Sequence, residues 1–322
     1  MMMGQNEDSE QLQLVRQKYG FDKPIGTQYV YYLNDLSPLS FHSTDKTDYT
    51  ALASGKYQAL RLFTIAKIQV AIKAPYLRES FTKQGKKVTQ VLAETLPNTF
   101  VLAVSAITIA LILGLIFGVI SALFKDQWLD KGIQVLSTLG MSVPSFFSAI
   151  LFAWVFGFIL HEYTNLEMTG SLYELDDFGE AMHIKWKNLI LPAIVLGIRP
   201  LAVVIQLMRN SLLEVFNQDY IRTARAKGLS EFQIIKNHAI KNALNPVVTA
   251  ISGWFASMLA GAVFVEYIFG WNGLGKEIVN ALNTLDLPVI MGSVLIIALM
   301  FIIINIFVDL MYAWLDPKVK LE

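Results

Sequence analysis

The chain has 322 residues, of which 54% are hydrophobic and only 16% are charged, and its mean hydropathy is +0.47. An average soluble domain carries roughly 25% charged residues, so this composition indicates a membrane protein. The 26 basic and 26 acidic residues balance and argue against a nucleic-acid partner, and the absence of cysteine excludes disulfides and thiolate metal sites. Because the four histidines are scattered along the sequence, we expect no metal site and no cofactor.

The first 94 residues contain no apolar run long enough to cross a bilayer, and the opening MMMGQNEDSE lacks the basic and hydrophobic parts of a signal peptide. Four uncharged runs follow, each with the roughly 20 residues that a transmembrane helix needs. A fifth run has the right length although Arg199 interrupts it. We therefore predict five transmembrane helices, at about 97–124, 133–160, 189–208, 246–266 and 287–314.

Lys and Arg residues between these helices predict the orientation. Ten of them lie in the loops after the first and third helices and in the C-terminal tail, whereas the other two loops hold three. Positive residues favour the cytoplasmic side, so we expect a cytoplasmic C-terminus and, after five crossings, an extracytoplasmic segment 1–87. Since nothing apolar precedes this segment, we expect a further transmembrane helix upstream. The alternative is a true five-span protein whose N-terminal segment is exported by another route.

Arg199 falls near mid-membrane, between Pro192 and Pro200. A charge there costs roughly 2.5–3.5 kcal/mol on insertion scales, so such a residue usually faces a partner or a water-filled path. Arg199 is therefore a candidate lining residue of a translocation path.

The loop 209–245 predicts a helix, a glycine turn and a second helix. Residues 211–227 have a helical pattern, and Gly228 follows as a C-terminal stop. Ser230 and Gln233 have the spacing of a capping box. The apolar residues that recur at spacings of three and four in the second helix are Phe232, Ile235, Ala239, Ile240, Ala243 and Leu244. We expect this amphipathic helix on the cytoplasmic side.

Residues 269–277, FGWNGLGKE, match the first seven positions of the phosphate-binding loop G-x-x-x-x-G-K-[ST]. The eighth position is Glu277, where a hydroxyl would be needed to bind magnesium. The stretch also falls in a predicted outer loop, away from cytoplasmic ATP. We therefore expect a tight glycine turn, a short helix from Lys276 to Leu285, and Trp271 at the level of the lipid headgroups.

The stretch YIRTARAKGLSEFQIIKNHAIKNALNP, at 220–246, strongly resembles the cytoplasmic coupling loop of ABC importer permeases, in the oligopeptide, dipeptide and nickel branch. The general loop pattern is E-A-A, three residues, then G. Ala224 and Gly228 match it, whereas Arg222 and Thr223 replace the Glu and the first Ala, a departure usual in the peptide branch.

Three further segments resemble the same branch: LPNTFVLAVSAITIALILGLIFGV, VEYIFGWNGLGKEIVNAL and NIFVDLMYAWLDPKVK. With KYGFDKPIGTQYVYYLNDL near the N-terminus, the resemblance covers about 22–36 and 80–322. It implies a missing first helix as well. Residues 41–77 look like an insertion without a counterpart.

The resemblance implies an all-α membrane protein with the fold of a type I ABC importer permease, its permease domain at 88–316. It also implies a place in the bacterial inner membrane and a function in moving peptides or a related small solute. The implied partners are a homologous permease in a heterodimer, two cytoplasmic ATPase subunits and an extracytoplasmic solute-binding protein.

The resemblance further implies that the loop docks in a groove of the ATPase, with Ala224 and Ala226 permitting close approach. The residues implied for this coupling are Arg222, Thr223, Ala224, Arg225, Ala226, Lys227, Gly228, Leu229 and Ser230. No catalytic motif is complete, so we expect no enzyme activity in this chain. The alternative is a self-sufficient secondary transporter or channel, which would need ion-coupling residues in the membrane. The solute, whether peptide, nickel or another, stays open.

Overall fold

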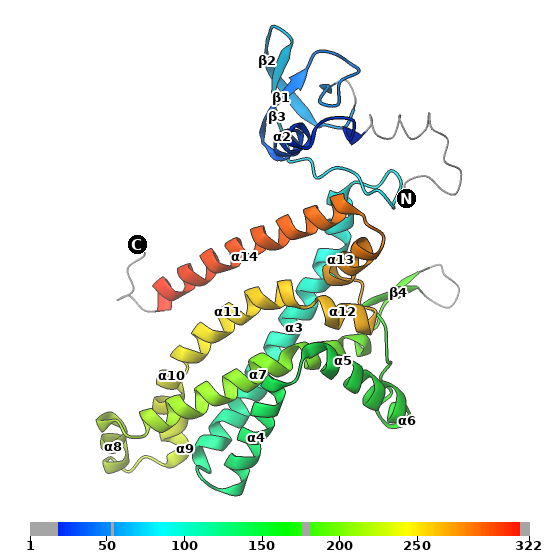
Figure 1. Ribbon diagram of the computed structural model, residues 1–322. Helices are drawn as coiled ribbons and strands as arrows, with labels where there is room; N and C mark the ends of the chain where they lie inside the picture. The colour runs from blue at the N-terminus through cyan, green and yellow to red at the C-terminus, as the bar shows by residue number, and fades with distance from the viewer. Residues whose placement is uncertain (1–18, 53–54, 176–180, 316–322) are drawn as a thin grey trace. The chain divides into compact units, whose positions relative to one another are not determined.

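A computed structural model describes residues 19–52, 55–175 and 181–315, which form two compact units. Unit 1 comprises Met1–Leu92 and Ala281–Gly292, and unit 2 comprises Ala93–Asn280 and Ser293–Glu322. Figure 1 shows the elements of both. The chain is mostly helical.

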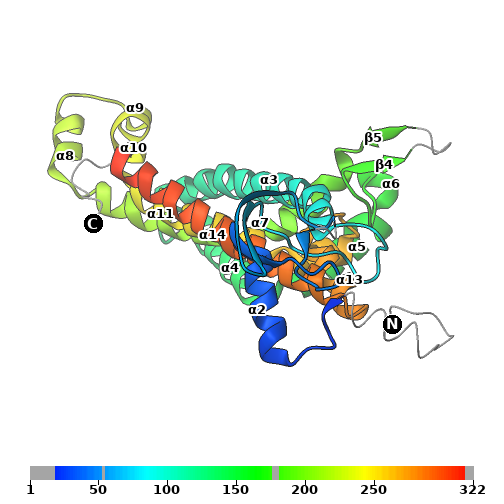
Figure 2. The same ribbon diagram turned by 90° about the horizontal axis from the view of Figure 1, so that it is seen from above.

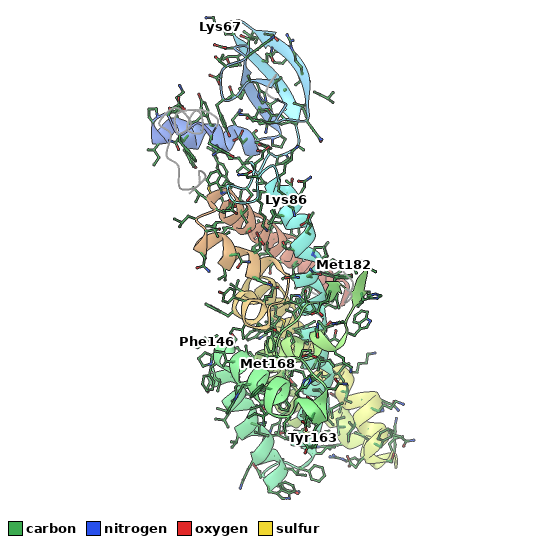
Figure 3. All side chains as sticks on the ribbon, turned by 90° about the vertical axis from the view of Figure 1, so that its right-hand side faces the viewer. Lys67, Lys86, Phe146, Tyr163, Met168 and Met182 are labelled. Atoms are coloured by element: carbon green, nitrogen blue, oxygen red, sulfur yellow. The ribbon has the colours of Figure 1, made fainter. Side chains whose placement is uncertain are left out.

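Unit 1 contains helix α2 (Ile25–Leu36) and an antiparallel sheet of strands β1 (Leu39–Ser43), β2 (Ala59–Ile65) and β3 (Ile68–Lys73), in the order β1-β3-β2. Residues 66 and 67 form the tight turn between β2 and β3, where Ala66 has a φ of 53° and Lys67 is labelled in Figure 3. The stretches LRLFTI and IQVAIK form strands because β-branched and aromatic residues dominate them. The expectation of an all-α chain is therefore wrong for the predicted insertion.

Strand β1 buries polar side chains and exposes apolar ones, whereas β3 buries the apolar Val70 and Ala71. Ser40 and His42 of β1 are buried, whereas Leu39 and Phe41 are about half exposed. Behind the sheet, the buried carboxylate of Asp35 accepts hydrogen bonds from two tyrosine hydroxyls and from the guanidinium of Arg78. Side chains of β1 alternate between a buried and an exposed face, as in an ordinary strand, but here the polar side chains are the buried ones.

Unit 2 contains the remaining elements, except that α3 and α14 begin in unit 1 and α13 ends there. These elements are α3 (Val88–Leu123), α4 (Trp128–Ser142), α5 (Ser145–Trp154), a π-helical segment (Val155–Ile159), α6 (His161–Thr164), β4 (Tyr173–Leu175), β5 (Met182–Ile184), α7 (Lys187–Val215), α8 (Asp219–Ala226), α9 (Glu231–Ile234), a second π-helical segment (Ile235–Ala239), α10 (Ile240–Ala243), α11 (Asn245–Gly261), α12 (Val263–Phe269), α13 (Leu274–Asn283) and α14 (Leu287–Leu315).

In the part of the chain that the structure describes, three helices are long and apolar enough to cross a membrane: α3, α7 and α14. A fourth span is possible if α4 and the helix that follows it, bent by 110° relative to each other, count as one. Helix α11 has 17 residues and ends at Gly261, so the predicted helix 246–266 is divided between α11 and α12.

The predicted transmembrane segment 133–160 is not one continuous helix, because the helix is interrupted at Val143 and Pro144. Both residues have extended ψ angles, 131° and 139°. Proline lacks an N–H and disfavours helical conformation in the residue before it, so the helix ends at Ser142 and a new one begins at Ser145.

Helices α3 and α7 pack closely because α3 carries glycines at the contact. A Cβ added to Gly114 or Gly118 would lie 2.5 Å from Val204 or 2.7 Å from Met208 of α7. Small residues allow such close approach between membrane helices. Helix α7 is joined to α4 by the guanidinium of Arg209, which donates to both carboxylate oxygens of Asp130, at 2.8 and 2.6 Å.

Candidate functional site

The loop 209–245 forms a small helical cap at one end of unit 2. It comprises the end of α7, then α8, and then the helix that begins with α9 and continues through α10. Figures 1 and 2 both show this cap at the end of unit 2 opposite β4 and β5. The predicted single helix 211–227 is wrong, because α7 ends at Val215 and α8 begins at Asp219. Asn217 marks the break, since its side chain donates to the carbonyl of Leu213, 2.9 Å away.

Helix α8 ends in a glycine turn, as the sequence predicts. Gly228 has a φ of +79°, a left-handed conformation that favours glycine. The N–H of Gly228 donates to the carbonyl of Arg225 at 2.9 Å, and that of Leu229 donates to Ala224 at 3.3 Å. This is the hydrogen-bond pattern of a Schellman cap, which turns the chain sharply away from the helix axis.

The predicted capping box at Ser230 is confirmed. The N–H of Gln233 donates to the hydroxyl of Ser230 at 3.4 Å, and the Gln233 side chain accepts from the N–H of Ser230 at 3.0 Å. Together, the Schellman cap and the capping box define both sides of the turn at Gly228.

One face of the cap is buried against the long helices of unit 2. Ile221, Ala224 and Ile234 belong to a buried cluster with Met208 and Leu212 of α7. The sequence pattern missed Ile234, which is fully buried, and included Phe232, whose side chain is 72% exposed. The first turn of α9 is therefore rotated relative to the predicted amphipathic face. The capping box could have shown this, because it fixes where the helix begins.

The opposite face of the cap is exposed and basic. The exposed residues of the predicted coupling set are Arg222, Thr223, Arg225, Ala226, Lys227, Gly228 and Ser230. Arg225 donates to both carboxylate oxygens of Glu231, at 2.9 and 3.4 Å, so this ion pair bridges the glycine turn. Arg222 pairs with Asp219 at 3.3 Å. Ala224, in contrast, faces the buried cluster, and only Ala226 of the two alanines is at the surface.

Arg199 lies on α7, roughly 24 Å along the helix from Val215, and is not part of the cap. It lines a cavity of about 90 Å³ together with Ser145, Ser148, Trp254 and Ser257. The cavity lies where α5, α7 and α11 meet.

The near match to a phosphate-binding loop is a structural junction. Glu266 of α12 is fully buried, and its Oε2 accepts hydrogen bonds from the N–H groups of Gly275 (2.6 Å) and Lys276 (3.2 Å) at the start of α13. These are the groups that would bind a phosphate, and a carboxylate already occupies them.

Trp271, which the sequence suggested lies among the lipid headgroups, is fully buried by protein side chains, and its indole N–H donates to the carbonyl of Asn98 at 3.0 Å. The tight turn at Gly270, with a φ of +68°, and the short helix that follows are as predicted, although α13 begins and ends two residues earlier than expected.

Comparison with known proteins bears out the resemblance to permeases. The family model for binding-protein-dependent transport system inner membrane components matches residues 114–321. A putative peptide permease protein of Brucella suis biovar 1 is 39% identical over 244 residues, which covers 76% of this chain and 75% of the relative. The dipeptide transport system permease protein DppB of Bacillus subtilis (strain 168) is 40% identical over 243 residues, with 76% and 74% covered.

Two solved structures have a similar fold. A chain from an amino acid ABC transporter crystallised with histidines superposes with a TM-score of 0.51 at 15% identity, covering 69% of this chain and 93% of its own length. A chain of the inward-facing MetNI methionine ABC transporter gives a TM-score of 0.51 at 16% identity, with 68% and 95% covered. At these identities the likeness concerns the fold alone.

Proposed function

Since the chain belongs to the family of binding-protein-dependent transport system inner membrane components, we propose that it forms part of the path by which peptides enter the cell. It is a permease subunit of an ABC importer in the inner membrane, not an enzyme, and ATP hydrolysis belongs to separate subunits. The names of its relatives, a putative peptide permease and a dipeptide permease, support peptides as the solute.

The observation that carries the mechanism is the geometry of the cap. Its buried face joins α8 and α9 to α7, so a force on the cap reaches the membrane helices through packed side chains. Its exposed face presents Arg222, Ala226 and Lys227 next to the turn at Gly228. We therefore infer that this face docks on a cytoplasmic ATPase. ATP binding would favour one orientation of the permease through differential contacts there.

The charge distribution supports a topology with the cap inside the cell. The basic loop 209–245 and strands β4 and β5, which belong to the acidic loop 162–187, lie at opposite ends of unit 2 (Figures 1 and 2). With five crossings, the C-terminus would be cytoplasmic and segment 1–87, with its sheet, extracytoplasmic. The partners we propose are a homologous permease, two ATPase subunits and an extracytoplasmic binding protein.

A reconstitution tests this proposal. The tagged chain is purified with the proteins that accompany it, and uptake of a tripeptide and of Ni²⁺ is measured in proteoliposomes. We expect an ATPase to co-purify, and we expect tripeptide uptake to require both ATP and the binding protein. Uptake by the chain alone, driven by a proton or sodium gradient, would show a secondary transporter instead.

A further inference from the structure

Arg199 is a charged residue in α7, a helix apolar enough to cross a membrane, and none of the described residues provides a counter-ion for it. Within residues 19–52, 55–175 and 181–315, it makes no ion pair and no hydrogen bond, and its side chain is exposed. Its neighbours on α7, Val195 and Leu196, are buried apolar residues. A lone charge at this depth is costly, so Arg199 needs either water or an anion from outside the described chain.

The surroundings of Arg199 offer further donors for an anion. Ser145 and Ser148 of α5 and Ser257 of α11 line the same cavity, and none of their hydroxyls is hydrogen-bonded within the described residues. The helix is also interrupted here. Helix α5 begins at Ser145 without a side-chain cap, which leaves the N–H groups of its first turn free of intrahelical partners. Half-helices that begin inside a membrane are a known arrangement for binding the anionic end of a solute.

We propose that Arg199 and the serine-lined cavity bind the carboxylate of the transported solute, which for a peptide is its C-terminus. The guanidinium supplies two parallel N–H donors that match a carboxylate, and the serine hydroxyls complete the site. The cavity of about 90 Å³ is much smaller than the roughly 300 Å³ or more of a typical ligand pocket, so it holds the end group alone. This inference rests on the proposed function, since it assigns a step to the imported peptide.

The test compares two probes that differ only in that end group, trialanine and trialanine amide, in the assembled transporter reconstituted in proteoliposomes. The variants are Arg199→Gln, which removes the charge, Arg199→Lys, which keeps the charge without the planar fork, and Lys131→Gln as a control. Lys131 is an exposed residue of α4 and lies outside the cavity. The binding protein is the same in every sample, so its own selectivity cancels when the variants are compared.

We expect Arg199→Gln to lower uptake of trialanine about ten-fold or more, as expected for the loss of a charge-assisted hydrogen bond, and to leave uptake of the amide unchanged. Unchanged amide uptake also shows that the variant is folded and coupled. Arg199→Lys should recover part of the trialanine uptake, and Lys131→Gln should behave as wild type.

Other results would overturn the inference. If Arg199→Gln lowers the uptake of both probes equally, or of neither, Arg199 does not bind the carboxylate of the peptide. The proposed carboxylate site is then wrong, while the proposal of peptide import stands. If the loss appears only when phosphatidylglycerol is added to phosphatidylcholine vesicles, the anion is a lipid headgroup. If wild-type transporter takes up neither probe with ATP and binding protein, the proposed function itself fails.

Discussion

Glu266 is a single buried residue that organises the junction between α12 and α13. Its carboxylate caps the first turn of α13, and the chain fits around it only because positions 273 and 275 are glycine: a Cβ on Gly273 would lie 2.4 Å from Oε1. Of the two glycines in the pattern that suggested a nucleotide site, G-x-x-x-x-G-K, Gly275 meets this requirement, whereas Gly270 is needed for the turn with a φ of +68°. Glycines and exposed N–H groups at a helix start suit a phosphate or a carboxylate equally well.

We predict that Glu266→Ala destabilises the protein. It leaves the buried N–H group of Gly275 without a partner, at a cost of about 1–3 kcal/mol, and it also removes the hydrogen bond to the part-buried N–H of Lys276. The thermal midpoint of the detergent-solubilised protein, followed by size-exclusion chromatography, should fall clearly. Glu162→Ala, at an exposed position of α6, is the control and should leave it unchanged. Equal midpoints for the two variants would mean that α13 does not depend on this carboxylate.

Substitutions of Gly228 can separate the effect of backbone strain from the effect of added charge. Nothing lies within 4 Å of a Cβ added there, so substitution has no steric cost beyond the left-handed backbone, about 1–2 kcal/mol for most residues. Asn and Asp have the same shape and both tolerate this conformation, and they differ in charge. We expect Gly228→Asp to reach the membrane normally but to lose peptide uptake, because it places a carboxylate on the face that we propose docks on the ATPase.

Gly228→Asn should keep most of the uptake, and Gly228→Ala should lie between the two. Membrane abundance by immunoblot, ATPase co-purification and uptake are measured for all three. Should the Asp variant transport at the wild-type rate with the ATPase bound, the proposed docking surface would have to lie elsewhere on the cap.

At the scale of elements, the sequence predicts features that depend on neighbouring residues and misses those that depend on distant contacts. The positions of α3 and α14 follow from uncharged runs, and that of α7 from an apolar run interrupted by Arg199, since a bilayer demands a fixed length of apolar helix. The turn at Gly228 follows from a motif of a few residues. The burial of Trp271 depends on Asn98, 173 positions away, and no pattern around Trp271 reveals that contact. Likewise, Pro144 marks a helix break in sequence, but not the cavity that α7 and α11 complete beside it.

The sheet of unit 1 was missed for a related reason. Alternation in β1 indicates a strand, but an ordinary strand buries its apolar side, and here Ser40 and His42 are inside. The polar side is stabilised by hydrogen bonds that come from elsewhere: the Nδ1 of His42 is 2.7 Å from the carbonyl of Thr50, and its Nε2 is 2.8 Å from the hydroxyl of Ser40.

This buried histidine predicts a pH dependence of the sheet. Burial lowers the pKa of His42 below its ordinary value of about 6.5, so the unfolded state takes up a proton first as the pH falls. The stability contributed by neutral His42 is therefore present above about pH 6.5 and is lost below it. We expect hydrogen-exchange protection of β1 and β3, corrected for intrinsic rates, to fall from about pH 7.5 to about pH 5.5. His42→Gln should show no such change, and an equal fall in both proteins would assign the effect to another group.

At the scale of the whole molecule, the proposed topology can be tested because the chain has no cysteine of its own. Lys67, at the turn of the β2–β3 hairpin, and Lys227, beside the turn of the cap, are both exposed. The bias of basic residues among the loops places the first outside the cell and the second inside. Lys67→Cys should therefore react with a membrane-impermeant maleimide in intact spheroplasts, whereas Lys227→Cys should react only after lysis. Because each variant is labelled in both conditions, low reactivity is distinguished from inaccessibility.

The reverse pattern would put the cap on the binding-protein side, where no ATPase could dock, and both the orientation and the coupling role would be wrong. Labelling of both residues in intact spheroplasts would require an even number of crossings between them.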